Sequence, residues 1–234
     1  MALADDLARL TELGAQGEDI SVEEVREAIV LVKDFFTTAM IADHHSAKGV
    51  RALTTKFRDA GRRSPPWRPT SSRVPGRPQD GADGNRITRW LLPPDHKFHA
   101  DEVTATLVEV KYYLQALSMK GAPVLPDSGF STAFEWLLGH RAEPGRYLDP
   151  VQLVEIDIRE VVKDPRMIQS GHLVPLDRGG RHEPNNAFLM LKESNDLQGS
   201  LTLDELLALM RRILDRHAAQ ARDRVKVEKR PRTR

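Results

Sequence analysis

The chain contains no cysteine, which excludes both a disulfide framework and a thiolate zinc site anywhere in its 234 residues. Long apolar runs are also lacking. The segment "AIVLV" at 28–32 is among the longest, whereas a membrane span needs about 20 residues. The first residues, "MALADDLARL", lack the basic-then-apolar build of a secretory signal. We therefore expect a cytoplasmic protein without a membrane segment.

The low net charge of +1 conceals strong local bias. Residues 51–90 and 211–234 each hold ten Lys or Arg side chains against three acidic ones, so the rest of the chain is net acidic. With 40% hydrophobic residues, the composition is that of a globular protein. The two basic stretches form an electrostatic footprint on an otherwise acidic molecule.

Apolar residues at helical spacing predict helices at 4–14, 21–43, 101–120 and 131–140. The second of these opens with Ser21 and Glu24, the spacing of a capping box. The segment "DPVQLVEIDIREVVKDP", which starts at Asp149, fits a helix with an N-cap but also partly alternates like a strand. Both interpretations stay open, and residues 1–164 are predicted to be mostly helical.

Residues 60–95 have a different texture, with five prolines among Arg, Ser and Gly in "GRRSPPWRPTSSRVPGRPQDGADGNR". Such a segment continues neither a helix nor a central strand. It is either a solvated connector or a loop that holds a phosphate backbone, with Trp67 available to stack on a base. For the second case the candidate DNA-binding residues are Arg62, Arg63, Arg68 and Arg73.

Residues 165–219 contain the most informative segment, "SGHLVPLDRGGRHEPNNAFLMLKESNDLQG". A short strand ends near Pro175, a turn-rich loop follows, and a second apolar strand runs into a helix. His172, Asn186 and Asn195 are separated by 14 and then 9 residues. The predicted order is strand, loop, strand, helix, in an α+β and mostly helical protein.

This segment resembles the HNH endonucleases of the ββα-metal superfamily. The text "GHLVP" is similar to the end of their first strand, "PNNAFLML" to their second strand and "SNDLQG" to their helix, which here makes an HNN variant. The resemblance covers residues 165–215, about a fifth of the chain. It implies a Mg²⁺- or Mn²⁺-dependent nuclease acting on double-stranded DNA, with His172, Asn186 and Asn195 as the catalytic set.

The chemistry of that family explains the residue types. Imidazole, with an ordinary pKa of about 6.5, can accept a proton from the attacking water. A hard divalent cation stabilises charge on the phosphate, and it prefers oxygen ligands such as the amide of Asn195. Asn186 is expected to hydrogen-bond to backbone across the loop and fix the histidine strand. In the loop, Arg178, Arg181 and His182 are weaker candidates for DNA contact.

Two departures from the family pattern matter. Gly171 stands where many members have a metal-binding Asp or His, so either Asn195 is the only side-chain ligand or a carboxylate arrives from elsewhere. Asp157 and Asp177 are the candidates for that role. The cysteine pairs that bind a structural zinc are absent, so no zinc is expected. The alternative without function makes His172 a half-buried structural histidine and Asn186 an ordinary turn residue after Pro184.

Size and architecture favour a site-specific restriction enzyme of type II character over a toxin domain or a homing nuclease. The alternatives are a non-specific nuclease and a non-catalytic DNA-binding protein on a degenerate HNH scaffold. Enzymes that cut both strands of a short site are mostly symmetric dimers, so we expect a homodimer, with helix 21–43 as the interface. Residues 1–164 would recognise DNA and dimerise, 165–219 would carry the nuclease motif with a closing helix, and 220–234 would form a frayed basic tail.

Overall fold

The computed structural model describes residues 2–64, 86–125 and 128–228. Its elements confirm the α+β, mostly helical class. Helices α1 to α4 span Ala2–Ala15, Val22–Ala42, Ala47–Gly61 and Glu102–Leu117, and α5 to α7 span Ser128–Ala133, Glu135–Leu138 and Ile158–Lys163. Strands β1 (Ile168–His172) and β2 (Ala187–Leu191) precede α8 (Lys192–Gln198) and α9 (Leu203–Glu228). Short 3-10 turns lie at 17–19, 89–91, 165–167 and 176–178.

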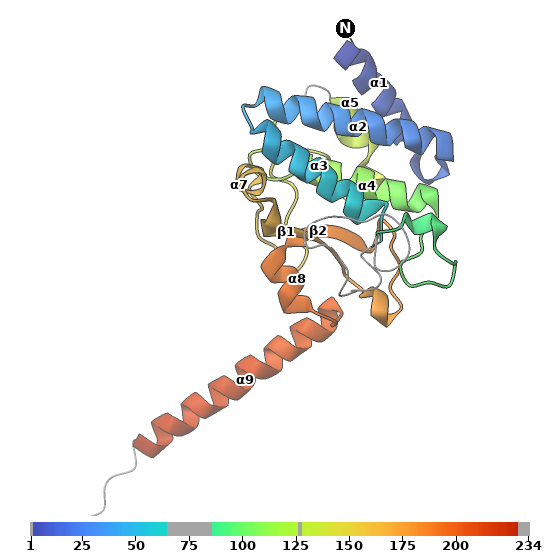
Figure 1. Cartoon of the computed structure of the whole chain (residues 1–234). Helices are drawn as coiled ribbons and strands as arrows, with labels where there is room; N and C mark the ends of the chain where they lie inside the picture. The colour runs from blue at the N-terminus through green and yellow to red at the C-terminus, as the bar shows by residue number, and fades with distance from the viewer. Residues whose placement is uncertain (1, 65–85, 126–127, 229–234) are drawn as a thin grey trace, which may run out of the picture.

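Helix α4 is the centre of the molecule, and Figure 1 shows it between the other N-terminal helices and the two strands. Every side chain from Ala105 to Leu117 is buried, as expected of a helix that is covered on all sides. The aromatic rings of Phe36, Phe57 and Tyr113 pack around it, with centroids 5.1–6.0 Å apart. The same hydrophobic core continues into the strands, so the sheet is built on α4.

Helix α2 begins as the sequence predicts, because both hydrogen bonds of the Ser21–Glu24 capping box are present. Its apolar face, which includes Val32, Phe36 and Met40, is buried in the core of the same chain. The face proposed for dimerisation is therefore already covered by α1, α3 and α4. This helix offers no large apolar surface to a second copy, apart from half-exposed Val30 and Ile41.

The sheet consists of β1 and β2 in antiparallel register, with His172 opposite Ala187. A two-stranded sheet is marginal by itself, so its outer edge needs support. The side chain of Gln115 on α4 accepts a hydrogen bond from the Leu189 N–H at 3.0 Å, and the Tyr147 hydroxyl donates to the Leu189 carbonyl. The Asp149 carboxylate accepts from the Leu191 N–H at 2.7 Å. Side chains from the helical region thus take the place of a third strand.

Segment 149–164 follows neither of the two interpretations left open. Asp149 does cap a turn, accepting from the backbone of Val151 and Gln152, but the chain then makes isolated bridges and enters a helix only at Ile158. Asp149 therefore does cap backbone N–H groups, but its carboxylate also accepts a hydrogen bond from β2, which is distant in the sequence. The frayed basic tail that was predicted to start at residue 220 does not start there, because α9 continues to Glu228. The run "AAQAR" after His217 consists of strong helix formers, which explains the extension.

The described helices include none that is both long and apolar enough to cross a membrane.

Candidate active site

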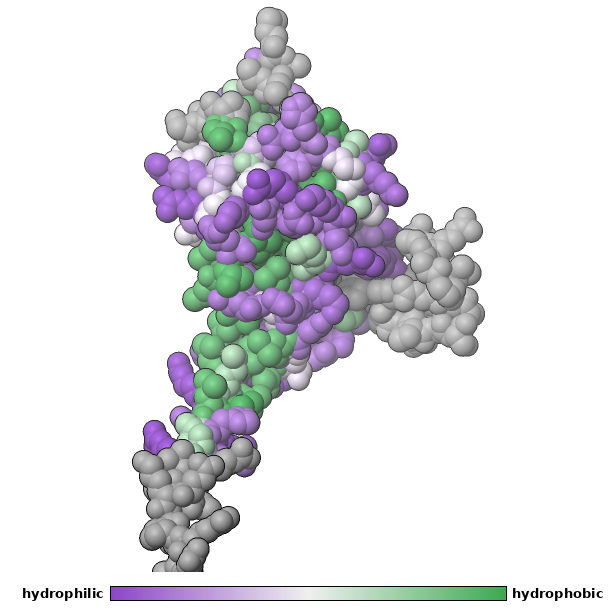
Figure 2. Space-filling model, turned by 90° about the vertical axis from the view of Figure 1, so that its left-hand side faces the viewer, coloured by the Kyte–Doolittle hydropathy of each residue, from purple (hydrophilic) through white to green (hydrophobic). Residues whose placement is uncertain are grey.

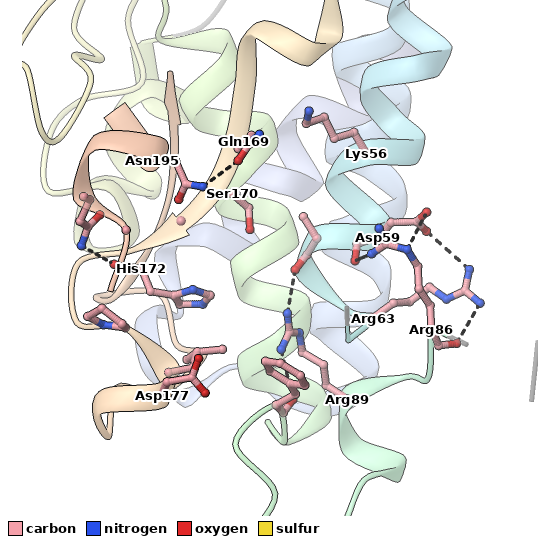
Figure 3. A pocket seen from close by; sticks show the side chains of 17 residues that line it. Lys56, Asp59, Arg63, Arg86, Arg89, Gln169, Ser170, His172, Asp177 and Asn195 are labelled. Atoms are coloured by element: carbon pink, nitrogen blue, oxygen red, sulfur yellow. Dashed lines mark hydrogen bonds and ion pairs between the residues drawn. The ribbon is translucent and has the colours of Figure 1, made fainter. Parts of the chain in front are cut away.

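The strand, loop, strand and helix order predicted for residues 168–198 is present. It brings His172, at the end of β1, and Asn195, on α8, to one cleft of about 580 Å³. Figure 3 shows these two residues on one side of the cleft and a row of basic side chains on the other. The basic side chains on the second side come from α3 and from residues 86–89, both distant in sequence from the strand, loop, strand and helix segment.

Asn186 lies outside the cleft lining and is nearly buried. Its amide oxygen accepts from the Val174 N–H at 2.8 Å, and its amide nitrogen donates to the carbonyls of Val174 and Arg181. These are the backbone hydrogen bonds expected across the loop. Gly180 is needed beside them, because a Cβ there would lie 2.0 Å from the Val174 carbonyl oxygen. The loop is therefore fixed directly behind the end of β1.

His172 is hydrogen-bonded to a second histidine, His182, with 3.0 Å between Nε2 of His172 and Nδ1 of His182. Nε2 of His182 lies 2.7 Å from the backbone carbonyl oxygen of Gly61 at the end of α3. A carbonyl oxygen only accepts, so Nε2 of a neutral His182 donates and its Nδ1 accepts. His172 must then carry its proton on Nε2, which leaves the lone pair on Nδ1. No described residue makes a hydrogen bond to that Nδ1.

Both histidines are neutral at physiological pH. Burial, followed by the nearby Arg89 cation, lowers the pKa of His172 from 6.5 to about 4. The same two causes lower the pKa of His182 well below its usual value, because this ring is only 1% exposed. The sequence predicted a DNA contact for His182; its position between His172 and α3 indicates a supporting role for the His172 ring instead.

Asn195 presents its amide oxygen over β1. Its amide nitrogen donates to the side chain of Gln169 at 2.7 Å, so the orientation of the amide is fixed. A Cβ on Gly171 would lie 2.9 Å from the Asn195 oxygen and 2.5 Å from the sulfur of Met190. The glycine therefore leaves the approach to that oxygen clear of a side chain, and it explains why no Asp or His stands at this position.

Of the two candidate carboxylates, Asp177 lines the cleft and Asp157 does not. Asp177 lies 2.5 Å from the ammonium group of Lys97, while Asp157 caps α7 and pairs with Arg159. Within the described residues, no three His, Asp or Glu side chains cluster as metal ligands do.

Arg89 is a buried cation at the base of the cleft, only 2% exposed. Its guanidinium donates to the carbonyls of Gly61, Ala60 and Phe98 at 2.9, 3.2 and 3.1 Å. No carboxylate forms an ion pair with it among the described residues. Burial lowers its pKa from 12.5 to about 10, so it stays protonated at neutral pH. Among the described residues, this positive charge next to the two histidines is balanced by carbonyl dipoles alone.

The described residues that line the cleft carry an excess of positive charge. Its charged lining side chains are Lys56, Arg63, Arg86, Arg89, Asp59 and Asp177. Asp59 forms ion pairs with Arg63 and Arg86 at 3.5 and 4.0 Å, which holds these arginines along the wall formed by α3. Since both histidines are neutral, four cations face two carboxylates among the described lining residues. This balance suits a polyanion.

The predicted DNA-binding arginines divide into several groups. Arg63 lines the cleft, whereas the Arg62 guanidinium pairs with the buried Glu109 carboxylate on α4 and is not part of the lining. Arg178 pairs with Glu205 at 2.8 Å. Arg181 is exposed on the loop. Arg68, Arg73 and Trp67 lie outside the described residues.

Sequence reasoning missed three parts of the site: helix α3, Arg89 and the buried Asp149. Helix α3 had a usable signal, since Ser46 caps it and Val50, Leu53 and Phe57 follow at helical spacing. The Asp149 carboxylate accepts from the Leu191 N–H and the Ser194 hydroxyl, and so joins β2 to α8. No local pattern distinguishes Arg89 from the other arginines near it.

No protein-family model matches the sequence, and a comparison with curated proteins finds no significant match. One solved structure, described as that of a type II restriction endonuclease, is similar with a TM-score of 0.45 and 23% sequence identity. The similarity covers 53% of this chain and 55% of that chain, so this chain spans about half the length of its structural neighbour. The assignment of the site therefore rests on its own geometry.

Proposed function

We propose that the protein is a metal-dependent DNA endonuclease of the HNH type that hydrolyses phosphodiester bonds. The observation that carries this proposal is a neutral His172, with its proton directed to Nε2, at the base of a positively charged cleft that also holds the Asn195 oxygen. Neutral imidazole is the form that accepts a proton, and a basic cleft attracts a phosphate diester. Both requirements of the reaction, a proton acceptor and a cleft lined by cations, are supplied by side chains that are distant in sequence and adjacent in the fold.

In this proposal Nδ1 of His172 takes the proton from the attacking water. A base with a pKa of about 4 is weak, but Arg89 contributes to that low value. A phosphate anion bound beside Arg89 would offset its charge and raise the pKa of His172, which makes the imidazole a stronger base when substrate is present. His182 holds the ring in the required tautomer, and Arg89 stabilises negative charge on the phosphate.

The residues present fit Mg²⁺ or Mn²⁺, because these ions use one or two protein oxygens and complete their coordination with water and phosphate. Asn195 would be the main ligand, since its amide oxygen is oriented by Gln169 and unobstructed by Gly171. Asp177 could supply a second oxygen on release from Lys97. When bound, such an ion would stabilise charge on the phosphate and the leaving oxygen.

Replacing Asn195 with alanine should weaken the binding of Mn²⁺, measured by calorimetry without DNA, and should raise the concentration of metal needed for cleavage. Asn195→Asp keeps an oxygen at this position and should bind Mn²⁺ at least as well as wild type. Asn185→Ala is the matched control, because Asn185 is an asparagine of the β1–β2 loop that lies outside the cleft. Identical Mn²⁺ binding by wild type and Asn195→Ala would show that the ligand assignment is wrong.

Double-stranded DNA is the proposed substrate, held along the wall that bears Lys56, Arg63 and Arg86. Replacing all three with alanine should flatten the dependence of log affinity on log salt by about 0.9 for each phosphate that the variant no longer neutralises. Arg9→Ala, a change on α1 outside the cleft lining, should leave the slope unchanged. An unchanged slope in the triple variant would place the DNA elsewhere, on the segment with Arg68 and Arg73 or on the basic C-terminus.

The test of the function is incubation of plasmid DNA with the protein, with Mg²⁺ or Mn²⁺ and then with a chelator. Discrete, metal-dependent fragments would establish site-specific cleavage of both strands, as in a restriction enzyme. A smear would establish a non-specific nuclease. A stable gel shift without cutting under any of these conditions would contradict the proposal and favour a DNA-binding protein on a degenerate HNH scaffold.

A further inference from the structure

Helix α9 leaves the body of the protein. It comprises 26 residues, which at 1.5 Å per residue corresponds to about 39 Å, and Figure 1 shows it extending away from the sheet. Its start is anchored, because Leu206 is only 2% exposed and a Thr202–Glu205 capping box fixes the first turn. All side chains from Arg211 to Arg222 are exposed. The helix from Arg211 to Arg222 is therefore not covered by the other described parts of the chain.

The exposed part of α9 carries an apolar face. Leu207, Met210, Ile213 and Leu214 are 37%, 40%, 42% and 66% exposed. Figure 2 shows this hydrophobic surface continuing from the lower part of the body onto the helix. Surface helices of monomers place their apolar residues against the core, so an apolar face in solvent marks a missing neighbour. An isolated helix also gains little stability without packing.

The spacing on this face is that of a coiled coil. Leu203, Leu207, Met210 and Leu214 follow one another at intervals of four, three and four residues, and His217 and Ala221 continue the series. Ile213 flanks it, so seven positions without a Lys, Arg, Asp or Glu form one seam, while buried Leu206 faces the body of its own chain. An alternation of three and four residues is the pattern by which two helices interdigitate over a common seam. This favours another helix as the occupant.

The charges on α9 indicate a second copy in antiparallel orientation. Its first turn is acidic, with Asp204 and Glu205, whereas residues 211–228 carry six Lys or Arg residues against three acidic ones, Asp215, Asp223 and Glu228. Parallel pairing would set the two arginine-rich halves side by side, while antiparallel pairing separates them. The helix dipoles favour the same arrangement. Nucleic acid fits this face poorly, since none of the seven seam residues is Lys or Arg.

We propose that the apolar face of α9, from Leu203 to Leu214, is the interface of a two-fold symmetric homodimer in which two α9 helices pair antiparallel. A two-fold axis pairs the same surface on both copies, so one seam suffices for both. The interface replaces the one expected on α2, whose apolar face is buried within each chain. It is independent of the proposed reaction, because it can be measured without DNA.

The test measures the molar mass of the full chain by light scattering over a range of concentrations. Wild type should have twice the chain mass of 26.3 kDa. The double variant Met210→Glu/Leu214→Glu should dissociate to the single-chain mass, with the dissociation constant raised at least about 100-fold, because two apolar side chains per copy are removed. Its far-UV circular dichroism below the protein's thermal transition should show a folded core.

Val30→Glu is the matched control, because Val30 is a half-exposed apolar residue on the outer face of α2. This variant should remain dimeric. A concentration of roughly 100 µM exceeds ordinary dimer dissociation constants. A wild-type protein that is still monomeric at that concentration would overturn the proposal. So would a dimer that survives Met210→Glu/Leu214→Glu or one that Val30→Glu dissociates.

The orientation can be tested separately because the chain has no native cysteine. Arg222→Cys introduces a single exposed thiol that a spin label can occupy. In an antiparallel dimer centred near Leu207 and Met210, the two labels should lie about 40 Å apart, from the rise of 1.5 Å per residue. A distance near 15 Å, on the scale of adjacent helices, would overturn the antiparallel pairing. A wild type that dimerises through α9 but never cuts DNA would disprove the proposed function and leave the interface intact.

Discussion

Replacement of His172 with alanine is expected to reduce the rate of DNA cleavage by about 10²–10⁴-fold, the usual contribution of a general base. DNA affinity should stay at its wild-type level, because the cations that line the cleft are unchanged. The measurements are single-turnover cleavage with Mg²⁺ and a gel-shift titration with the metal chelated. Cleavage within a few-fold of wild type would remove His172 from the mechanism.

Two variants of His182 distinguish a positioning role from a purely structural one. His182→Asn can still donate from its amide nitrogen to the Gly61 carbonyl and accept from His172 with its amide oxygen, so much of the activity should survive. His182→Leu removes the acceptor and should lower kcat with little change in KM. Equal loss of activity in both variants, with equal loss of stability, would contradict the positioning role.

Replacement of Asp149 with alanine is expected to lower the free energy of unfolding by about 3–5 kcal/mol, since each buried donor left without a partner costs about 1–3 kcal/mol. The carboxylate is fully buried and accepts four hydrogen bonds. Two come from the turn that follows it, one from the Leu191 N–H and one from the Ser194 hydroxyl. Its removal therefore loosens the junction of β2 and α8.

Urea unfolding of the variant provides the measurement. Asp164→Ala is the matched control, because Asp164 also caps a short turn but its side chain is 42% exposed, and its replacement should cost less than about 1 kcal/mol. Asp149→Ala should also reduce cleavage at temperatures where it is still folded, because α8 carries Asn195. A destabilisation no larger than that of Asp164→Ala would show that water replaces the carboxylate.

The parts of the fold that follow from neighbouring residues could be predicted. The Ser21–Glu24 capping box and the apolar run of β2 both depend on residues within a few positions of one another, and both form as expected. Segment 149–164 could not be predicted in this way. Its first residue, Asp149, takes two of its partners more than 40 positions along the chain.

The candidate site divides in the same manner. His172, Asn186 and Asn195 form a motif within one short segment of the sequence, and the fold brings the first and last of them to one cleft. His182 is hydrogen-bonded to the Gly61 carbonyl, which is 121 positions away. Because this partner is a backbone atom, no residue type in the sequence predicts the contact. No sequence pattern distinguishes Arg89 either, because it is one of ten basic residues between 51 and 90.

The support of β2 by side chains has a consequence for self-association. Exposed strand edges are the usual templates for runaway pairing between chains, which leads to aggregates and fibres. Here Gln115, Tyr147 and Asp149 occupy the backbone groups of Leu189 and Leu191 that a foreign strand would need. The edge is blocked by fixed partners from the same chain, so growth by strand addition is closed on that side. Any assembly of the folded protein through β2 must first displace three buried side chains.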